Sequence, residues 1–594
     1  MCTTPGLSIL ILIIALEEVK PPKKKQKPPF LGGRDRANKP EIVTVITFWR
    51  LDQFCRGLRW PFHDVANVRA ASSARFCIHD DASPCVPPRT AQVASRACGL
   101  GNRWSDLADT YSNHPYLDAQ CKSSPESYTI KISLPHRQAE FYPVTCRLPP
   151  HPQVPFKLFL DVFPQLANMQ LTQAWTERYR QPPPPFGHAC LDLYSLDPEY
   201  LNLNNGSYGT TPKPVTQAVH ELTVKIERSP DLFHRVDYQP MLKKVRARLA
   251  KLVGAQTEEI FLVNNASMGV NTVLRNFQWE QGDIIFKFTT TYGSVTGTVK
   301  SISDFPPHPT VVTIPLLFPT TKEEIIKSLK DHLAAHPALP NKKRVAVIDS
   351  IISNPGVKLP WQEMVQICKD ENVWSVVDAA HSIGQEVGID LTKTAPDFWV
   401  SNCHKWLSAK RSCAVLYAPL RNQHIIKTAI PTGHTYQSNP VDQAAYIESQ
   451  FEWNGTIDWT PYLTVENALD YREWLGGEEA INEYCHDLAI KGGEELARIL
   501  GTRLMDTTGE FTLNMTNVEL PLPTSLKPTA ELIDRINRML LVEHNAFSAF
   551  FYHNGAWWTR CSAQVWNEIE DFRGIAKIWL DICNEFRKEL GLPE

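Results

Sequence analysis

From Phe186 onward, short apolar runs alternate with amphipathic segments, and this alternation restricts the fold more than any other feature. Strands are predicted at EEIFLVNNAS, GDIIFKFTT, HPTVVTIPL, KRVAVIDSI, VWSVVDAA and DFWVSNC, and helices at segments such as YQPMLKKVRARLAKLVGA and TKEEIIKSLKDHLAAH. Strands that alternate with helices predict a mostly parallel sheet with helices on both faces. Strands that are apolar throughout are typical of a sheet buried on both sides. We therefore expect an α/β fold.

Composition divides the chain into three segments. Residues 1–185 hold half of the 46 prolines and half of the 14 cysteines, and Pro-rich sequence resists both helices and central strands. We expect a poorly structured, largely disordered extension there; the alternatives are sequence added by an error in the gene model and a separate functional domain. Residues 186–450 are predicted to form an N-terminal arm and the large domain. Residues 451–594, with a more helical pattern, are predicted to form a small α+β domain.

Charge, cysteine spacing and hydropathy exclude several classes of function. A net charge of −3 gives no reason to expect a nucleic acid partner. The cysteines form no C-x-x-C pair and no spacing typical of a metal site, so we expect reduced thiols, no metal and a cytoplasmic location. The apolar run at residues 7–16 is too short for a bilayer, which needs about 20 residues. No basic segment precedes this run, and we expect no membrane anchor.

Three of the predicted strands end in unusual polar residues, and open parallel sheets bind ligands at these carboxyl ends. After the run that ends at Val263, a helix is predicted to start near Ser267. Asn265, Ala266 and Ser267 would line a phosphate site made by the free N–H groups of that helix start. The alternative is an ordinary helix cap, because Asn and Ser are common cap residues.

The other two strand ends carry an acid and a lysine. Asp378 ends a fully apolar run, with His381 three residues later. A buried carboxylate needs a partner or a chemical role; it could keep a heterocyclic nitrogen protonated, or it could cap the next helix. Lys405 follows the next predicted strand. A desolvated lysine has a lowered pKa and can act as a Schiff-base nucleophile, whereas a surface lysine extends its charge into water.

These three features are most informative together. A phosphate cradle, a buried aspartate and a Schiff-base lysine on one sheet edge are the contacts that pyridoxal phosphate requires. The cradle would bind the phosphate, and Asp378 would keep the pyridine nitrogen protonated. Lys405 would bind the aldehyde and then move protons. The combination predicts a pyridoxal phosphate enzyme.

From about Gly187 onward, the chain resembles class V aminotransferase-fold enzymes, which have the fold type I architecture of pyridoxal phosphate-dependent transferases. The matching motifs are YLNLNNGSYGT, VNNASMGVNTVL, VVDAAHSIGQ, SNCHKWL, FEWNGTIDW and TRCSAQVWNE. Within this family the chain is most similar to the fungal isopenicillin N epimerase-like proteins and hercynylcysteine sulfoxide lyases. LNNGSYGT and GGEEAINEYCH point to the lyases. Residues 1–185 are not covered by the resemblance.

The resemblance implies roles for residues around the cofactor. Lys405 and Asp378 would act as described above, His381 would lie near the phenolic oxygen of the ring, and Tyr292 would stack on the ring; these four are the implied catalytic residues. The residues implied for the phosphate of the same subunit are Ala266, Ser267, Ser401 and His404.

Further implied residues concern the substrate and a second subunit. Arg560 would bind the substrate carboxylate as a bidentate pair, and Asn205 would sit by the substrate. Gly455 and Thr456 would reach the phosphate of a neighbouring subunit, which implies a homodimer. Ser353 and Asn354 would lie near the cofactor by rough alignment.

The resemblance also implies a reaction, in which Lys405 removes the Cα proton of a cysteine conjugate and β-elimination follows. The preferred substrate is hercynylcysteine sulfoxide, the precursor of ergothioneine. Desulfurases of this family carry a nucleophilic cysteine on a loop before the arginine. Here no cysteine lies between Cys485 and Cys561, so we expect no persulfide chemistry. The sequence leaves open an amino-acid epimerase, another family enzyme of secondary metabolism, and a catalytically silent binding protein.

Overall fold

The computed structural model describes residue 175 and residues 177–592, other than 439, 441, 442 and 454, together with six short strands nearer the N-terminus. The chain divides into two compact units, Met1–Phe159 and Leu160–Glu594. Most of the predicted extension at residues 1–185 lies outside the described residues. The apolar run at residues 7–16 also lies outside them, except for its last two residues, which begin β1. The predicted domain boundaries after residues 185 and 450 stay predictions.

The described strands of the first unit form two small antiparallel groups. β1 pairs with β2, and the other four adjoin in the order β3-β6-β5-β4. Their bounds are Ala15–Glu18 (β1), Ile42–Val45 (β2), Cys77–Ile78 (β3), Gln120–Ser124 (β4), Ser127–Ile132 (β5) and Tyr142–Cys146 (β6). No site residue is predicted in this unit.

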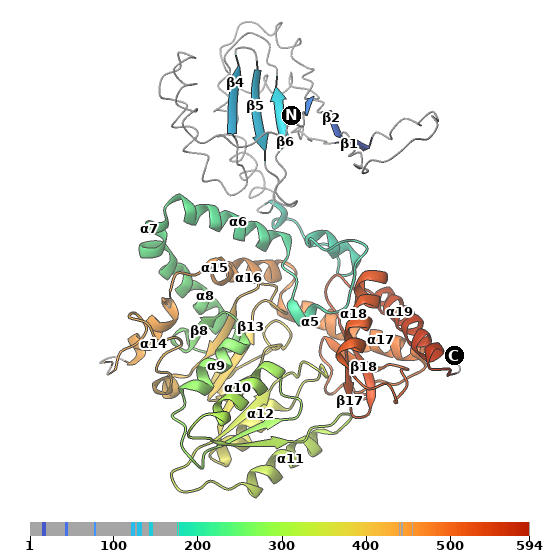
Figure 1. Ribbon diagram of the computed structural model, residues 1–594. Coiled ribbons are helices and arrows are strands. Elements are labelled where there is room, and N and C mark those ends of the chain that lie inside the picture. Colours follow the sequence, from blue (N-terminus) through green and yellow to red (C-terminus); the bar gives the residue numbers. More distant parts are fainter. Residues whose placement is uncertain are drawn as a thin grey trace, which may run out of the picture. The chain divides into compact units, whose positions relative to one another are not determined.

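A seven-stranded sheet forms the centre of the second unit (Figure 1). Its order is β10-β9-β11-β12-β13-β14-β8, and only β14 is antiparallel to its neighbours. The bounds are Ile260–Val263 (β8), Ile284–Phe288 (β9), Thr310–Ile314 (β10), Arg344–Asp349 (β11), Trp374–Asp378 (β12), Phe398–Asn402 (β13) and Ala414–Tyr417 (β14). The prediction of an α/β fold with a mostly parallel sheet is confirmed.

Side chains of the sheet alternate between two buried cores. On one face, Phe261 and Val345 belong to the same core as residues of α9 (Ala266–Asn276), α10 (Gly293–Asp304) and α14 (Gln443–Glu452). On the other face, Ala346 and Trp399 belong to the same core as residues of further helices. These include α8 (Tyr238–Val253), α11 (Lys322–Ala335), α12 (Trp361–Asp370), α15 (Thr460–Leu463) and α16 (Val465–Trp474). Burial on both faces explains why the strands are continuous apolar runs.

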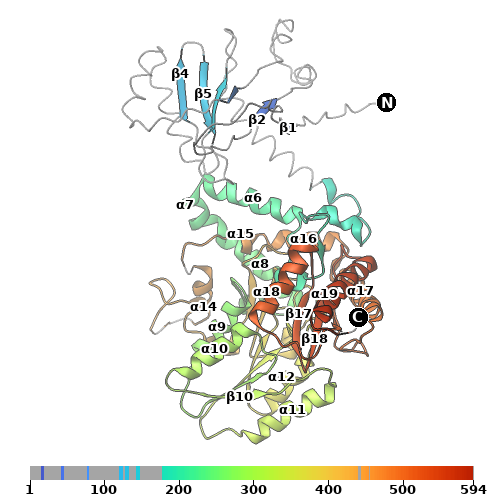
Figure 2. The ribbon, with the colours of Figure 1, turned by 45° about the vertical axis from the view of Figure 1, so that its right-hand side comes forward.

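The C-terminal part forms a smaller α+β arrangement, as predicted. Its antiparallel sheet has the order β15-β18-β17, with bounds Met515–Glu519 (β15), Ala549–His553 (β17) and Ala556–Ser562 (β18). The long helices α17 (Gly477–Leu500) and α19 (Ile569–Glu589) lie side by side next to it, with α18 (Ala530–Arg538) nearby (Figures 1 and 2). Leu488, Val518 and Trp579 belong to their common core.

The N-terminal arm of the second unit adds a two-stranded sheet to its two larger sheets. Trp175 and Tyr179 precede it and pack around Trp474, with the Tyr179 and Trp474 ring centroids 5.3 Å apart. The arm then forms β7 (Leu201–Asn202), which pairs with β16 (Ala546–Phe547), the helix α5 (Asn205–Tyr208), and α6 (Lys213–Arg228). Gly209 ends α5 with φ of 68°, and a Cβ there would lie 1.6 Å from the carbonyl oxygen of His404. Only glycine allows this close approach.

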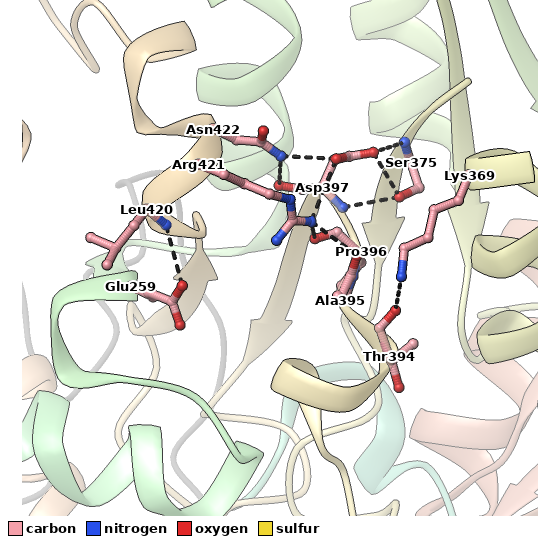
Figure 3. Close-up of polar contacts among 10 residues, drawn as sticks. All are labelled: Glu259, Lys369, Ser375, Thr394, Ala395, Pro396, Asp397, Leu420, Arg421 and Asn422. Atoms are coloured by element: carbon pink, nitrogen blue, oxygen red, sulfur yellow. Dashed lines mark hydrogen bonds and ion pairs between the residues drawn. The ribbon is translucent and has the colours of Figure 1, made fainter. Parts of the chain in front are cut away.

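A polar network fixes the amino-terminal edge of the large sheet, opposite the edge that carries the predicted site (Figure 3). The Asp397 carboxylate accepts hydrogen bonds from Ser375 N, Ser375 Oγ and Asn422 Nδ2, at 2.9, 3.2 and 2.9 Å. Arg421 lies 3.5 Å from the same carboxylate. Because Ser375 is in β12 and Asp397 directly precedes β13, the network holds these two strands in register.

Candidate active site

The carboxyl ends of β8, β12 and β13 bring the predicted site residues to one edge of the sheet. Asp378 is the last residue of β12, and Asn402 is the last residue of β13, three positions before Lys405. The Ala266 N–H, at the start of α9 after β8, donates to Asn402 Oδ1 over 2.9 Å. The predicted meeting of these strand ends is therefore seen in the structure.

Lys405 lies in a chain of hydrogen bonds with His381 and Trp406. Lys405 Nζ is 2.9 Å from His381 Nε2, and Trp406 Nε1 donates to His381 Nδ1 over 3.3 Å. An indole N–H can only donate, so Nδ1 must accept and the imidazole proton must reside on Nε2. That proton then points at Lys405 Nζ, which accepts it as a neutral amine.

The electrostatics of this cluster agree with a neutral lysine. Burial, together with the Arg560 guanidinium, lowers the pKa of Lys405 from 10.5 to about 7, against the opposing effect of Asp378. Burial and the neighbouring cations also hold the pKa of His381 well below 6.5, so the imidazole is neutral. With a pKa of about 7, a large share of the amine is uncharged at neutral pH, and the uncharged amine is the form that attacks a carbonyl or removes a proton.

Asp378 is buried and has a second acid beside it. It accepts a hydrogen bond from Ala380 N over 3.1 Å, and burial raises its pKa while Lys405 lowers it. Asp349 ends β11 at the position paired with Asp378. Burial and the Asp378 charge raise the pKa of Asp349 well above 3.8, and Thr291 Oγ1 is its hydrogen-bond partner at 3.5 Å. The sequence analysis did not identify Asp349, although it also ends an apolar run.

Two helix starts face each other next to this edge. Ser267 Oγ, in the first turn of α9, lies 2.6 Å from Ser294 Oγ, in the first turn of α10. Asn265 caps α9 by accepting from Met268 N over 2.9 Å. The predicted cap is therefore present. The Ala266 N–H donates to Asn402 Oδ1 and the Gly269 N–H to Asn265 O, which leaves the Ser267 N–H of this first turn for a ligand, and the phosphate site stays a prediction. Two adjacent helix starts with hydroxyls suit an anion with several oxygens.

Ser401 and His404, both predicted to hold the phosphate, differ in burial. Ser401 is fully buried; its hydroxyl donates to Ala379 O over 2.5 Å and accepts from Ile383 N over 3.0 Å, so it is used within the protein. Asn402, which the sequence analysis did not select, reaches the start of α9 in its place. His404 is partly buried, with Nδ1 3.3 Å from Cys413 O, and burial lowers its pKa to about 4.

The predicted ring-stacking and partner-subunit residues lie at the surface. Tyr292 is the cap residue of α10, and 51% of its surface is exposed. Gly455 has a φ of 135°, a conformation that glycine adopts readily. Thr456 lines an open groove of about 730 Å³ together with His234, Trp453 and others. These positions leave Tyr292 and Thr456 accessible to a ligand or to a second subunit.

Arg560, in β18, is a buried cation without an acidic partner among the described residues. Only 1% of its surface is exposed. Nη1 donates to Ser353 O over 2.5 Å, and Nη2 donates to Asn204 Oδ1 and to Ser207 Oγ, both over 2.9 Å. Burial lowers its pKa to about 10. A guanidinium surrounded by neutral acceptors retains its charge for an anionic ligand.

The arm helix α5 joins this arginine to the lysine. Asn205 Nδ2 donates to Lys405 O over 3.1 Å, and its Oδ1 is buried with no hydrogen-bond partner among the described residues. Asn204 and Ser207, on either side of Asn205, hold Arg560. The structure thus brings Asn205, Lys405 and Arg560 together, as predicted, and adds Asn204 and Ser207. Asn354, which precedes the cis-proline Pro355, lies next to Ser353, whose carbonyl binds Arg560.

Arg472 is a second buried arginine that the sequence analysis missed. It donates to Trp406 O over 2.7 Å and to Gly384 O over 2.9 Å, and it forms a two-point ion pair with Glu478 at 2.6 and 2.7 Å. It therefore links the loop of Lys405 to the loop of His381. Arg472 lies 66 residues after Trp406, within the helical pattern of α16, and this position gave no signal of the role in the sequence.

The seven cysteines from Cys190 to Cys583 are free and buried. They include Cys485 and Cys561, the two that flank the segment without cysteines. Burial raises the pKa of both thiols to about 12. A thiol with a raised pKa is a poor nucleophile, which agrees with the expectation that no loop cysteine carries the chemistry.

The residues present fit pyridoxal phosphate. Ser267, Ser294 and the N–H groups of the two helix starts would hold its phosphate. Asp378 would face its pyridine nitrogen, and Lys405 its aldehyde. The buried Asn205 Oδ1 has no hydrogen-bond partner among the described residues, which leaves it free to accept from a bound ligand.

Comparison with families and curated proteins gives consistent matches. The family model for aminotransferase class V matches residues 205–527. The chain is 31% identical over 447 residues to the L-cysteine desulfhydrase-like protein lolT1 of Epichloe uncinata, covering 68% of this chain and 98% of the relative. It is 32% identical over 402 residues to the hercynylcysteine sulfoxide lyase of Schizosaccharomyces pombe, covering 67% of this chain and 98% of the relative.

Solved structures share the fold at lower sequence similarity. The cysteine desulfurase from Thermococcus onnurineus NA1 superimposes with a TM-score of 0.54 at 18% identity, covering 68% of this chain and all of that one. This likeness supports the fold type I architecture and does not extend to the reaction. Among the described residues, no helix combines the length and the apolar character needed to cross a membrane.

Proposed function

The chain belongs to the class V aminotransferase family, its cofactor is pyridoxal phosphate, and on that premise we propose that it cleaves the C–S bond of hercynylcysteine sulfoxide. One observation carries the chemistry: Lys405 and Arg560, a cation without an acidic partner among the described residues, are both buried and are joined through the arm residues Asn204, Asn205 and Ser207. The amine can remove a proton, and the cation can bind the carboxylate of an amino acid. The similarity to the sulfoxide lyase of Schizosaccharomyces pombe, over 98% of its length, supports the substrate.

Lys405 acts as the general base in this proposal. Its pKa of about 7 places it near the working pH, where a base is both available and strong enough to be useful. His381 presents an N–H to Lys405 Nζ, because Trp406 holds the opposite ring nitrogen as an acceptor. Lys405 takes the proton from Cα of the substrate. Bound pyridoxal phosphate supplies the electron sink for the pair left on Cα.

Asp378 supports that electron sink. A carboxylate facing the pyridine nitrogen keeps that nitrogen protonated and therefore electron-withdrawing. Its burial makes the interaction strong, since charges attract more strongly where water is excluded. Arg560 would orient the amino acid by its carboxylate, and Tyr292, exposed at the start of α10, would cover the ring.

The bond that breaks next is the bond between Cβ and sulfur. Elimination is redox-neutral, so the electron pair from Cα forms the Cα–Cβ double bond and the sulfoxide sulfur leaves as a sulfenic acid. The three-carbon remainder is hydrolysed to pyruvate and ammonia. Reduction of the sulfenic acid by a thiol then gives ergothioneine. No cysteine of the chain is required for the elimination, which agrees with the buried thiols.

The proposal includes a homodimer in the cytoplasm. Gly455 and Thr456 would complete the phosphate site of the second subunit. In support, Thr456 lines an open groove at the surface, and Leu232 and Val236, near the same groove, are more than half exposed at 52 and 57%. Exposed apolar side chains of this kind favour contact with another protein surface.

A substrate panel tests the proposal. The cofactor-loaded protein is incubated with hercynylcysteine sulfoxide, L-cysteine and L-cystine, and pyruvate release is measured. We expect the highest kcat/KM for the sulfoxide and no release by Lys405→Ala, with Lys410→Ala, an exposed lysine five residues later, as the matched control. Faster pyruvate release from L-cysteine than from the sulfoxide would contradict the proposed substrate. Epimerised substrate without pyruvate would contradict the lyase.

A further inference from the structure

The hydrogen bonds of Arg560 are distributed unevenly over its guanidinium. The group has five N–H donors: one on Nε and two on each of Nη1 and Nη2. Both donors of Nη2 are engaged, by Asn204 Oδ1 and Ser207 Oγ. Nη1 uses one donor for Ser353 O, and Nε has no hydrogen-bond partner among the described residues. The free donors therefore lie on Nε and Nη1.

A carboxylate cannot bind this arrangement bidentately as it stands. Two parallel hydrogen bonds from a guanidinium to a carboxylate use either Nε with Nη2, or Nη1 with Nη2. Each of these pairs requires a donor of Nη2. A bidentate carboxylate must therefore displace Asn204 or Ser207. In this structure these two side chains occupy the donors that the carboxylate would use.

Ser207 is the acceptor that can leave. It is partly exposed, whereas Asn204 is buried, and it lies near the carboxyl end of the four-residue helix α5, next to Tyr208, which is 72% exposed. Its own proton goes to Asn204 Oδ1, over 2.8 Å, so Ser207 offers Arg560 only a lone pair. A charged carboxylate is a stronger acceptor for a guanidinium than a neutral hydroxyl.

We propose that the substrate carboxylate replaces the Ser207 hydroxyl on Arg560, so that Ser207 is an exchangeable ligand of the arginine in the carboxylate site. This rests on the proposed function, in which Arg560 binds the amino acid. Ser207 satisfies the buried cation while no amino acid is bound and leaves when one arrives. Asn204 stays in place and keeps the guanidinium oriented. Neutrality of both acceptors is essential, because an acid at either position would form a permanent ion pair and exclude the substrate.

The exchange predicts opposite effects for two variants of the cofactor-loaded protein. Binding of L-alanine, which has a carboxylate but no leaving group, is followed through the absorption change of the bound cofactor. Ser207→Ala removes the competing acceptor, and we expect a Kd about fivefold lower, as the loss of one competing hydrogen bond implies. Asn204→Asp adds a fixed carboxylate, and we expect a Kd at least about tenfold higher. Tyr208→Phe, on the same helix, is the control and should bind as the wild type does.

L-alaninamide separates this inference from the proposed function. The amide has no carboxylate, so its Kd should be the same in the wild type and in Ser207→Ala. Equal or weaker binding of L-alanine by Ser207→Ala would overturn the exchange, as would unchanged binding by Asn204→Asp. If the wild type binds L-alanine no more tightly than L-alaninamide, the carboxylate role of Arg560 in the proposed function fails instead.

Discussion

Replacing Trp406 by phenylalanine tests how the protein keeps Lys405 neutral. The change removes the indole N–H that donates to His381 Nδ1 over 3.3 Å. His381 is then free to carry its proton on Nδ1, which leaves Nε2 as an acceptor for a charged lysine. The protonated form of Lys405 gains a hydrogen bond, and its pKa rises.

The size of this shift follows from the hydrogen bond that changes. A net hydrogen bond contributes about 1 kcal/mol, and one pKa unit corresponds to about 1.4 kcal/mol. The pKa of Lys405 should therefore rise from about 7 by up to about one unit. Only the neutral amine captures pyridoxal phosphate, so the pH midpoint of capture reports this pKa directly.

The assay follows cofactor capture by the apoprotein through absorption, at a series of pH values. The wild type should show a midpoint near pH 7, and Trp406→Phe a midpoint higher by up to about one unit. Trp399→Phe is the matched control, because Trp399 is equally buried and its Nε1 has no hydrogen-bond partner among the described residues. A wild-type midpoint near 10 would refute the lowered pKa, and an unchanged midpoint in Trp406→Phe would refute the role of the indole.

Three further variants address the rest of the site. The folded state raises the pKa of Asp349, so the stability that its neutral form contributes is complete at low pH and is lost as pH rises through the folded-state pKa. In Asp349→Asn, the Tm of the apoprotein, measured by calorimetry, should therefore fall less between pH 5 and pH 8 than in the wild type. Arg472→Gln leaves Glu478 without its ion pair and should lower the unfolding free energy by about 3 kcal/mol or more in urea titrations, with partial recovery in the double variant with Glu478→Gln. Asn402→Asp places a negative charge at the start of α9, and the Kd of pyridoxal phosphate, measured by titration, should rise at least about tenfold; an unchanged Kd would argue against a phosphate there.

The strands and helices of the large domain were predictable, but their arrangement was not. Each buried parallel strand is an apolar run, so β8 to β13 were found from the sequence. The short antiparallel strand β14, Ala414–Tyr417, was not among the predicted strands, although it is an apolar run as long as β8. The position of β8 beside β14, at the far edge from β9, depends on pairing between distant segments and not on local sequence.

The same distinction applies to the site. Lys405 and Asp378 were predictable because they follow apolar runs, and parallel strands end at one edge. Whether Ser401 or Asn402 reaches the start of α9 was not predictable. Neighbouring side chains of a strand point to opposite faces, and the last residue of the strand is unknown in advance. Asn204 and Ser207 lie more than 350 residues before Arg560 and in a helix too short to show a period.

The central claim is that removal of the Cα proton leads to cleavage of the C–S bond. The most direct test is NMR of hercynylcysteine sulfoxide incubated with the cofactor-loaded protein in D₂O, in the presence of a thiol. The account predicts that substrate is lost with equimolar formation of pyruvate and ergothioneine, and that Lys405→Ala is inactive. Recovered substrate that carries deuterium at Cα with inverted configuration, without pyruvate, would contradict it.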